Sequence, residues 1–294
     1  VDIWMKREDL LPIAFGGNKL RNLEFLVGAA LADGADTLVT SGRRWSNHCR
    51  LTAAAGARAG LDVHLVLSGP PAPGGPGPNI RMAELLGATV HQLPTAERDE
   101  REAAVARIAA ELREAGRRPW VIGVGGSGSV GAFGQVLAAK EALAQAEAAG
   151  VAVDAIVLPS ATGGTQAGLI VGASLTSPRT VVDGVIVARP EDELRSAIAA
   201  MVAELAAWTG ATVAADAIRF DPDQLGHGYG LPTPAADDAT RLLAGTEGIL
   251  VDPIYTAKAL ASLIAAVRSG HHDGRTVVFW HAGGTLGLLE RFDE

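Results

Sequence analysis

The chain of 294 residues has little cysteine, few aromatic side chains and no long run of basic or apolar residues. Its single cysteine, Cys49, cannot form an internal disulfide bond, which excludes a disulfide-stapled scaffold and favours a reducing compartment such as the cytoplasm. With 25 Lys and Arg against 33 Asp and Glu, the net charge is -8 and no basic stripe forms, so neither nucleic acid nor anionic membrane is an expected partner. Even the most apolar stretch, 155–175, is interrupted by Pro, Thr and Gly, which excludes a membrane span there.

What the sequence does contain is 48% hydrophobic residues and 36 glycines, with short apolar runs alternating with helical patterns. This alternation is typical of an α/β fold with parallel sheets. The expected strands are 2–6, 36–40, 62–67, 88–92, 119–124, 154–158, 181–187 and 276–280. The expected helices are 18–33, 46–60, 79–87, 96–116, 129–149, 164–175, 190–208, 234–245 and 254–269. Because the chain begins inside an expected strand, we expect a further segment before it.

Two other segments have a simple interpretation. The Pro/Gly-rich stretch 68–79 predicts a mobile surface connection that cannot form a core. The charged tract 94–118 predicts a helix whose polar face is solvated and carries no more specific role.

The stretch FGGNKLRNLE, 15–24, places Lys19 at the head of an apolar stripe that continues through Leu23 and Val27. Asn18 is a candidate N-cap, which would put Lys19 in the first turn of a helix, where the free N–H groups disfavour an ammonium. Partial burial would push this lysine further toward its neutral, nucleophilic form. The alternative is an ordinary lysine that extends to solvent from a helix start.

Three glycine-rich stretches follow expected strands. The first, 123–131, matches GxGxxG twice but lacks the acidic residue that a dinucleotide site needs about twenty residues on, so a turn that shapes a cleft is the better interpretation. The second, ATGGTQAGL, offers backbone N–H groups and two threonine hydroxyls at a helix start, which suits one phosphate; it lacks the lysine of a P-loop. The third, HAGGT at 281–285, repeats this layout as a tight turn or a ligand contact.

Polar residues gather in SGRRWSNHCR, where Ser46 or Asn47 can cap the next helix. His48 has no second ligand at metal-binding spacing, so no metal site is expected. The two tyrosines of the chain, Tyr229 and Tyr255, fall in segments marked by glycine or proline, which favours a site over the core. A desolvated lysine, a single-phosphate loop, an Asn/Ser turn and two loop tyrosines together are what pyridoxal 5'-phosphate requires.

The motifs GGNKLRNLE, SNHCR, ATGGTQAGL, GYG followed by Pro, DPIYTAK and HAGG occur in the order and spacing of one enzyme family. Over nearly its whole length the chain resembles the D-cysteine desulfhydrase and 1-aminocyclopropane-1-carboxylate deaminase family, whose members are fold type II pyridoxal phosphate enzymes of the tryptophan-synthase-β-like group. The resemblance implies a two-domain α/β fold of parallel-rich twisted sheets flanked by helices. Residues 1–25 and 141–294 would form the larger, cofactor-binding domain and residues 26–140 the smaller one, whose closure would complete the site.

The resemblance also implies a role for each matching residue. Lys19 would form the Schiff base with the cofactor and move the substrate α-proton. The implied catalytic residues are Lys19, Ser46, Tyr229 and Tyr255. The implied cofactor contacts are Lys19, Asn47, Thr162, Gly163, Gly164, Thr165 and Thr256. The implied substrate contacts are Ser46, Trp45 and His48.

Three positions bear on the subfamily. Thr256 matches the desulfhydrases, which carry Thr or Ser there, and differs from the deaminases, which usually carry Glu. Ala282 replaces the Thr or Leu that precedes the late glycine pair, so Thr256 or Thr285 would have to face the pyridine nitrogen instead. Trp45 replaces a common Gln, and its indole should reshape the substrate pocket. The neighbouring Arg43 and Arg44 would add an anion contact.

The expected function is therefore α,β-elimination of a small β-substituted amino acid, such as D-cysteine or a sulfonated analogue, to pyruvate and ammonia. Three alternatives stay open: deamination of 1-aminocyclopropane-1-carboxylate to 2-oxobutyrate, cofactor binding with little catalysis, and the dinucleotide binder. The family suggests a homodimer that acts on a small amino acid in the cytoplasm.

Overall fold

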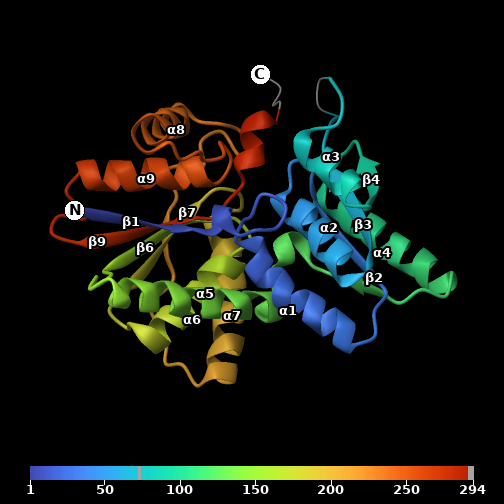
Figure 1. Ribbon diagram of the computed structural model, residues 1–294, viewed down its shortest axis with the longest axis horizontal. Helices are drawn as coiled ribbons and strands as arrows, with labels where there is room; N and C mark the ends of the chain where they lie inside the picture. Colours follow the sequence, from blue (N-terminus) through green and yellow to red (C-terminus); the bar gives the residue numbers. More distant parts are fainter. Residues whose placement is uncertain (72–73, 291–294) are drawn as a thin grey trace.

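The computed structural model describes residues 1–71 and 74–290, which form two parallel sheets with helices on their faces (Figure 1). Residues 72–73 of the predicted Pro/Gly connection, and 291–294 at the end of the larger predicted domain, lie outside the described residues. The strands are β1 (Asp2–Arg7), β2 (Thr37–Arg43), β3 (Asp62–Ser68), β4 (Thr89–Leu93), β5 (Pro119–Val121), β6 (Ala155–Ser160), β7 (Val181–Ile186), β8 (Arg219–Asp221) and β9 (Thr276–His281). The helices are α1 (Lys19–Ala32), α2 (Asn47–Ala59), α3 (Pro78–Leu85), α4 (Arg98–Glu114), α5 (Ser129–Ala148), α6 (Gly164–Thr176), α7 (Glu191–Thr209), α8 (Pro234–Glu247) and α9 (Thr256–Arg268).

Every strand and helix expected from the sequence is present among the described residues, with ends shifted by at most three residues. The strand that the sequence did not reveal is β8, which has three residues and pairs with β7 at the edge of a sheet. Its half-buried RFD sequence is too short to show an alternating pattern. Three short 3-10 turns, η1 (Glu8–Leu10), η2 (Val124–Gly126) and η3 (Thr285–Leu289), were also not predicted.

The larger sheet has the strand order β1-β9-β6-β7-β8, with all pairs parallel. Its central strand β6 is a continuous apolar run because both faces are covered. Ile156 and Leu158 pack against α5, α6 and α7, while Ala155 and Val157 pack against α8 and α9 on the opposite face. Figure 1 shows these two helix layers above and below the sheet.

The smaller sheet has the order β4-β3-β2-β5 and is also parallel. Leu38 and Leu65 face a core shared with α1, α2 and α3, and Val39 and Val66 face α4. The chain passes from the larger sheet into the smaller through α1 and returns through α5, which packs on both α1 and α6.

These connections bring several carboxyl ends of strands and starts of helices to one place between the sheets. In open parallel sheets this is where ligands bind. Gly16 and Gly17, with φ of 62° and 123°, make the tight turn that leads into α1. The next residue, Asn18, donates its backbone N–H to the carbonyl of Ala282 at 2.9 Å, so the start of α1 is held against the end of β9.

Candidate active site

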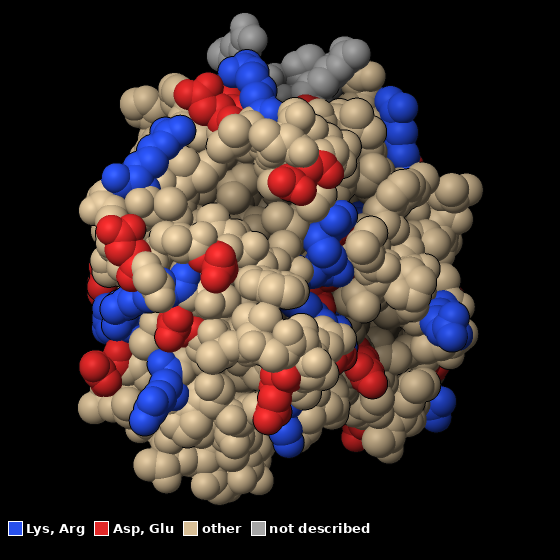
Figure 2. Space-filling view, turned by 60° about the vertical axis from the view of Figure 1, so that its left-hand side comes forward, with Lys and Arg blue, Asp and Glu red and all other residues tan. Residues whose placement is uncertain are grey.

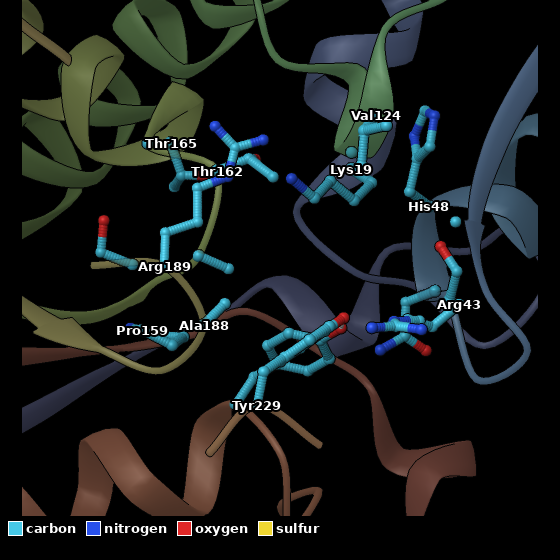
Figure 3. A pocket seen from close by; sticks show the side chains of 18 of the residues that line it. Lys19, Arg43, His48, Val124, Pro159, Thr162, Thr165, Ala188, Arg189 and Tyr229 are labelled. Carbon is cyan, nitrogen blue, oxygen red and sulfur yellow. Dashed lines mark hydrogen bonds between the residues drawn. The ribbon is translucent and has the colours of Figure 1, made fainter. Parts of the chain in front are cut away.

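A cavity of about 350 Å³ lies where these ends meet (Figure 3). Nine of the twelve site residues expected from the sequence line it, namely Lys19, Ser46, Asn47, His48, Thr162, Gly163, Thr165, Tyr229 and Tyr255. The other three, Trp45, Gly164 and Thr256, do not reach its wall. Residues from both sheets therefore contribute to one space.

Lys19 is the first residue of α1, and its side chain projects into the cavity (Figure 3). Its Nζ makes no hydrogen bond or ion pair with any described residue. Burial lowers the pKa of Lys19 to about 8. The expected cap is absent: the Asn18 side chain accepts no N–H of the first turn, and its amide group donates to Thr165 Oγ1 at 2.8 Å. The amine is thus available, and much of it is neutral near pH 8.

The start of α6 forms an anion cradle opposite this amine. Gly163 precedes the helix in a left-handed conformation, φ 86°, and no side chain caps the free N–H groups of the first turn. A Cβ on Gly163 would lie 2.6 Å from the Ile198 side chain, so only glycine fits this turn. The Thr162 and Thr165 side chains border the same end of the cavity. This arrangement suits a phosphate.

The turn into α2 forms a second wall. Ser46 is the N-cap, since its Oγ accepts from the backbone N–H of Cys49 at 3.2 Å. Asn47 follows, and its Oδ1 accepts from the Arg50 guanidinium at 3.2 Å. Burial raises the pKa of the Cys49 thiol to about 12, so this cysteine is not a nucleophile at neutral pH.

His48 is buried beside them and is neutral. Its Nε2 lies 3.0 Å from Thr40 Oγ1, and that hydroxyl donates its own proton to the carbonyl of Ile122. Nε2 must therefore carry the imidazole proton, which leaves Nδ1 as an acceptor with no partner in the described residues. Burial, with the charge of Lys19 nearby, lowers the pKa of His48 to about 3. His48 thus offers a hydrogen-bond acceptor and no charge.

The two tyrosines meet at the opposite wall. The hydroxyls of Tyr229 and Tyr255 are 2.5 Å apart, and burial raises the pKa of both phenols, so both are neutral. Asp252 holds Tyr255 at the start of α9 by accepting from its backbone N–H at 2.9 Å. Lys258 donates to the carbonyls of Leu225 and Gly228, which fixes the loop that carries Tyr229.

Thr256 and Trp45 act away from the cavity. The Thr256 hydroxyl is fully buried and bonded to the carboxylate of Asp252, so it does not face a ligand. Trp45 packs edge-on against Tyr229 with ring centroids 6.0 Å apart, and Gly230 makes room for its indole. Gly164 opens α6 through its backbone.

The sequence interpretation missed three arginines that line the cavity. Arg189 follows β7, and Arg98 and Arg101 lie in the first turn of α4. Arg101 contradicts the prediction of a wholly solvated polar face on that helix, because it is 8% exposed. Its spacing of three and seven residues from the buried Ala104 and Ile108 places it on the inward stripe, so the pattern did contain the signal.

Comparison with known proteins agrees with this geometry. The sequence pattern of the family described as "Pyridoxal-phosphate dependent enzyme" matches residues 1–283. The chain belongs to this family. D-cysteine desulfhydrase of Salmonella typhi is 38% identical over 293 residues, which cover 98% of this chain and 88% of that protein.

Solved structures support the same family and fold. A crystal structure of an ACC deaminase homologue superposes with a TM-score of 0.89 at 33% identity, covering 98% of this chain and 86% of that one. A threonine deaminase from T.th., 24% identical, superposes with a TM-score of 0.65 over 99% of this chain and 89% of that one, which shows the shared fold alone. The fold is that of the type II pyridoxal phosphate enzymes, as expected from the sequence.

The residues of this pyridoxal-phosphate dependent enzyme fit the cofactor on their own chemistry. Lys19 offers an unpaired amine for the aldehyde, and the uncapped start of α6 offers a phosphate cradle.

No group of three or more His, Cys, Asp or Glu among the described residues could hold a metal ion. On the face in Figure 2, acidic and basic side chains are interspersed. None of the described helices is long and apolar enough to cross a membrane.

Proposed function

We propose that this enzyme is a lyase that carries out α,β-elimination on a small β-substituted amino acid of the D-cysteine kind. The products would be pyruvate, ammonia and the leaving group, which is sulfide for D-cysteine. The observation that carries the proposal is the unpaired amine of Lys19 facing the α6 phosphate cradle, in a chain 38% identical to a D-cysteine desulfhydrase over nearly its full length.

The residues of each cavity wall would serve one step of the reaction. When bound, pyridoxal phosphate supplies an electron sink for negative charge at the substrate Cα. The start of α2, with Ser46, would hold the substrate carboxylate, and Asn47 would contact the cofactor. Lys19 Nζ, with its pKa lowered to about 8, would take the proton from Cα.

The paired phenols would serve the leaving group. Because Tyr229 and Tyr255 share one hydrogen bond between two hydroxyls, one phenolic proton remains to be donated to a departing thiolate. Released 2-aminoacrylate then gives pyruvate and ammonia with one water.

The second candidate is 1-aminocyclopropane-1-carboxylate deaminase, favoured by the structural similarity to an ACC deaminase homologue. Two observations favour elimination over it. Position 256 carries no carboxylate, and the hydroxyl there is bonded to Asp252. Among the described residues, the one carboxylate that lines the cavity is the exposed Glu193.

The test is a panel of D- and L-amino acids and the cyclopropane amino acid, assayed with the cofactor-loaded enzyme for pyruvate and for 2-oxobutyrate. Pyruvate from a β-substituted amino acid is the expected result. Release of 2-oxobutyrate alone would transfer the assignment to the deaminase. Bound cofactor with no turnover of any compound would support a binding protein of little activity, the possibility raised by Ala282 and Trp45.

We also propose that two domains move, with the expected bounds 1–25 with 141–294 and 26–140. The first half of α5 packs in the core of the larger sheet and would move with that domain. In support, each sheet has its own core, and α2 with Ser46 and Asn47 covers the smaller sheet. Small-angle scattering with and without cofactor and substrate analogue tests closure. A substrate-independent profile would count against it.

A cytoplasmic homodimer is the remaining part of the proposal. The buried thiol of Cys49 suits a reducing compartment. The exposed Ile3 and Trp4 on edge strand β1 offer an apolar contact surface. Light scattering should give twice the chain mass, and the Trp4→Glu variant should shift it toward the monomer.

A further inference from the structure

The cavity has more positive charge in its wall than its own carboxylates compensate. Five cationic side chains line it: Lys19, Arg43, Arg98, Arg101 and Arg189. Arg98 pairs with Glu102 at 2.8 Å and lies 3.9 Å from Glu193. Arg43, Arg101 and Arg189 make no ion pair within 4.0 Å with any described residue. Three guanidinium groups therefore line the cavity with no carboxylate within ion-pair distance. The charge of Glu102 acts on Arg101 and Arg189, and that of Glu193 on Arg189, from farther away.

Arg101 gives the strongest evidence for a bound anion because its side chain is buried. Only 8% of the residue is exposed, one guanidinium nitrogen donates to Ser68 Oγ at 3.1 Å, and its Nε is buried with no partner. A buried guanidinium is costly unless an anion compensates it. Arg43 adds a like charge that acts on Arg101 and lowers its pKa further. Ser68, the hydrogen-bond partner of Arg101, is also the register partner of Arg43 between β3 and β2, so both arginines border the same part of the cavity. This placement indicates that an anion binds between them.

The Arg43 and Arg101 pair lies at the tyrosine end of the cavity. Both charges act on Tyr229 and lower the pKa of its phenol against the larger effect of burial. In Figure 3, Arg43 lies beside the Tyr229 hydroxyl, and Arg189 lies on the opposite side, toward Thr162. The pair is thus separated from the phosphate cradle, and the substrate carboxylate has its own donors at the α2 turn. The part of the substrate that Arg43 and Arg101 would contact is therefore the leaving group on Cβ.

We propose that the substrate carries a strong-acid oxyanion on Cβ, a sulfonate or a phosphate ester, and that Arg43 and Arg101 bind it. This inference rests on the proposed elimination at the same site. Guanidinium groups form paired hydrogen bonds with such oxyanions, whereas the neutral thiol of cysteine would leave the two cations uncompensated.

The chemistry balances with the residues present. For a sulfonate, Lys19 takes the Cα proton, the Cβ–S bond breaks with its electron pair, and sulfite leaves. One water then converts 2-aminoacrylate to pyruvate and ammonia. As the bond breaks, the charge on the leaving group rises from -1 to -2, so the two guanidinium groups stabilise the transition state more than the ground state.

The experiment compares substrates on the cofactor-loaded enzyme. Cysteate and O-phosphoserine carry the proposed oxyanions and release sulfite and phosphate respectively, and β-chloroalanine carries a small uncharged substituent. Both enantiomers of each are assayed for pyruvate, with sulfite or phosphate measured in parallel. We expect kcat/KM for one oxyanion substrate to exceed that for cysteine at least tenfold, and the released anion identifies which.

Variants then test the two arginines. Arg101→Gln, and independently Arg43→Gln, should lower kcat/KM for the oxyanion substrate about 30-fold or more and change β-chloroalanine turnover less than threefold. The matched control is Arg107→Gln on the same helix, where an exposed pair with Glu111 is lost and neither activity should change. An unchanged cofactor absorbance band shows that each variant is folded.

The other outcomes are distinct. Turnover of β-chloroalanine with no preference for an oxyanion would overturn this inference and leave the elimination standing. Equal losses on both substrates would assign the arginines to the α-carboxylate and also overturn it. No elimination from any compound would refute the proposed function itself.

Discussion

Lys258 is the buried residue on which the tyrosine wall depends, and replacing it by Met gives a quantitative test. The side chain is fully buried in α9, and its Nζ donates to the carbonyl of Leu225 at 2.8 Å and to that of Gly228 at 3.4 Å. These bonds join the loop before Tyr229 to the helix that begins after Tyr255. Methionine is one atom shorter than lysine, but it keeps the packing of the side chain as far as Cε while it removes both hydrogen bonds.

The expected effect follows from these two distances. A charge-assisted hydrogen bond contributes about 1.5–3 kcal/mol, and the 3.4 Å contact contributes little. Because Met also removes the cost of burying an ammonium, the net loss of unfolding free energy should be about 1–2 kcal/mol, or a few degrees in Tm. If the variant weakens the ordered position of the Tyr229 loop by about 2 kcal/mol relative to displaced positions, the active population, and with it kcat/KM, falls by up to about 30-fold.

The assay is kcat/KM for pyruvate release, measured for Lys258→Met, Tyr229→Phe and the double variant. Since Lys258 acts through the position of Tyr229, the double variant should be about as active as Tyr229→Phe alone. Independent, multiplicative losses would refute the reasoning. Thermal unfolding of the three proteins separates this effect from general destabilisation.

Three further predictions concern Gly163 and Lys19. Gly163→Ala should weaken pyridoxal phosphate binding at least tenfold, because a φ of 86° and a Cβ only 2.6 Å from Ile198 would distort the phosphate turn. The control is Gly210→Ala, where φ is 71° and the space around the Cβ is open, and it should leave binding unchanged. Equal effects of the two variants in a cofactor titration would contradict the account. The rate at which added pyridoxal phosphate produces its visible band should rise with pH around a midpoint near 8, the lowered pKa of Lys19, and a midpoint near 10.5 would show an unperturbed lysine. In the cofactor-free protein the same lowered pKa means that the unfolded state binds more protons between about pH 8 and 10.5, so Lys19 should make stability rise with pH across that window. Below the window its contribution should not depend on pH, as chemical denaturation against a Lys19→Met variant would show.

Much of the fold and site could be predicted because the signals are local. Apolar periods located every described helix and all strands but β8, whose three residues are too few for a pattern. Glycine placement located the tight turn at 162–165 that we propose binds the phosphate, since a φ of 86° and the nearby Ile198 side chain favour glycine at 163. The capping serine, Ser46, was one of two candidates offered by the turn.

What sequence reasoning did not foresee depends on long-range packing. Asn18 fits a helix cap locally, yet its side chain turns to Thr165, which is 147 positions away. Thr256 belongs to a motif of the site, but its hydroxyl is bonded to Asp252 and not to the cavity. Arg101 sits in a charged tract, and only the fold of α4 against the smaller sheet carries it to the cavity wall.

The central claim is that Lys19 holds the cofactor, and borohydride reduction followed by peptide mass mapping tests it most directly. The chain has four lysines, and Lys258 is fully buried whereas Lys19 is half-buried in the cavity wall, so the assignment is discriminating. A yellow protein whose visible band disappears on reduction and leaves one pyridoxyl group on Lys19 is the predicted result. An adduct on Lys258 or on a surface lysine, or no adduct with the cofactor present, would contradict the account.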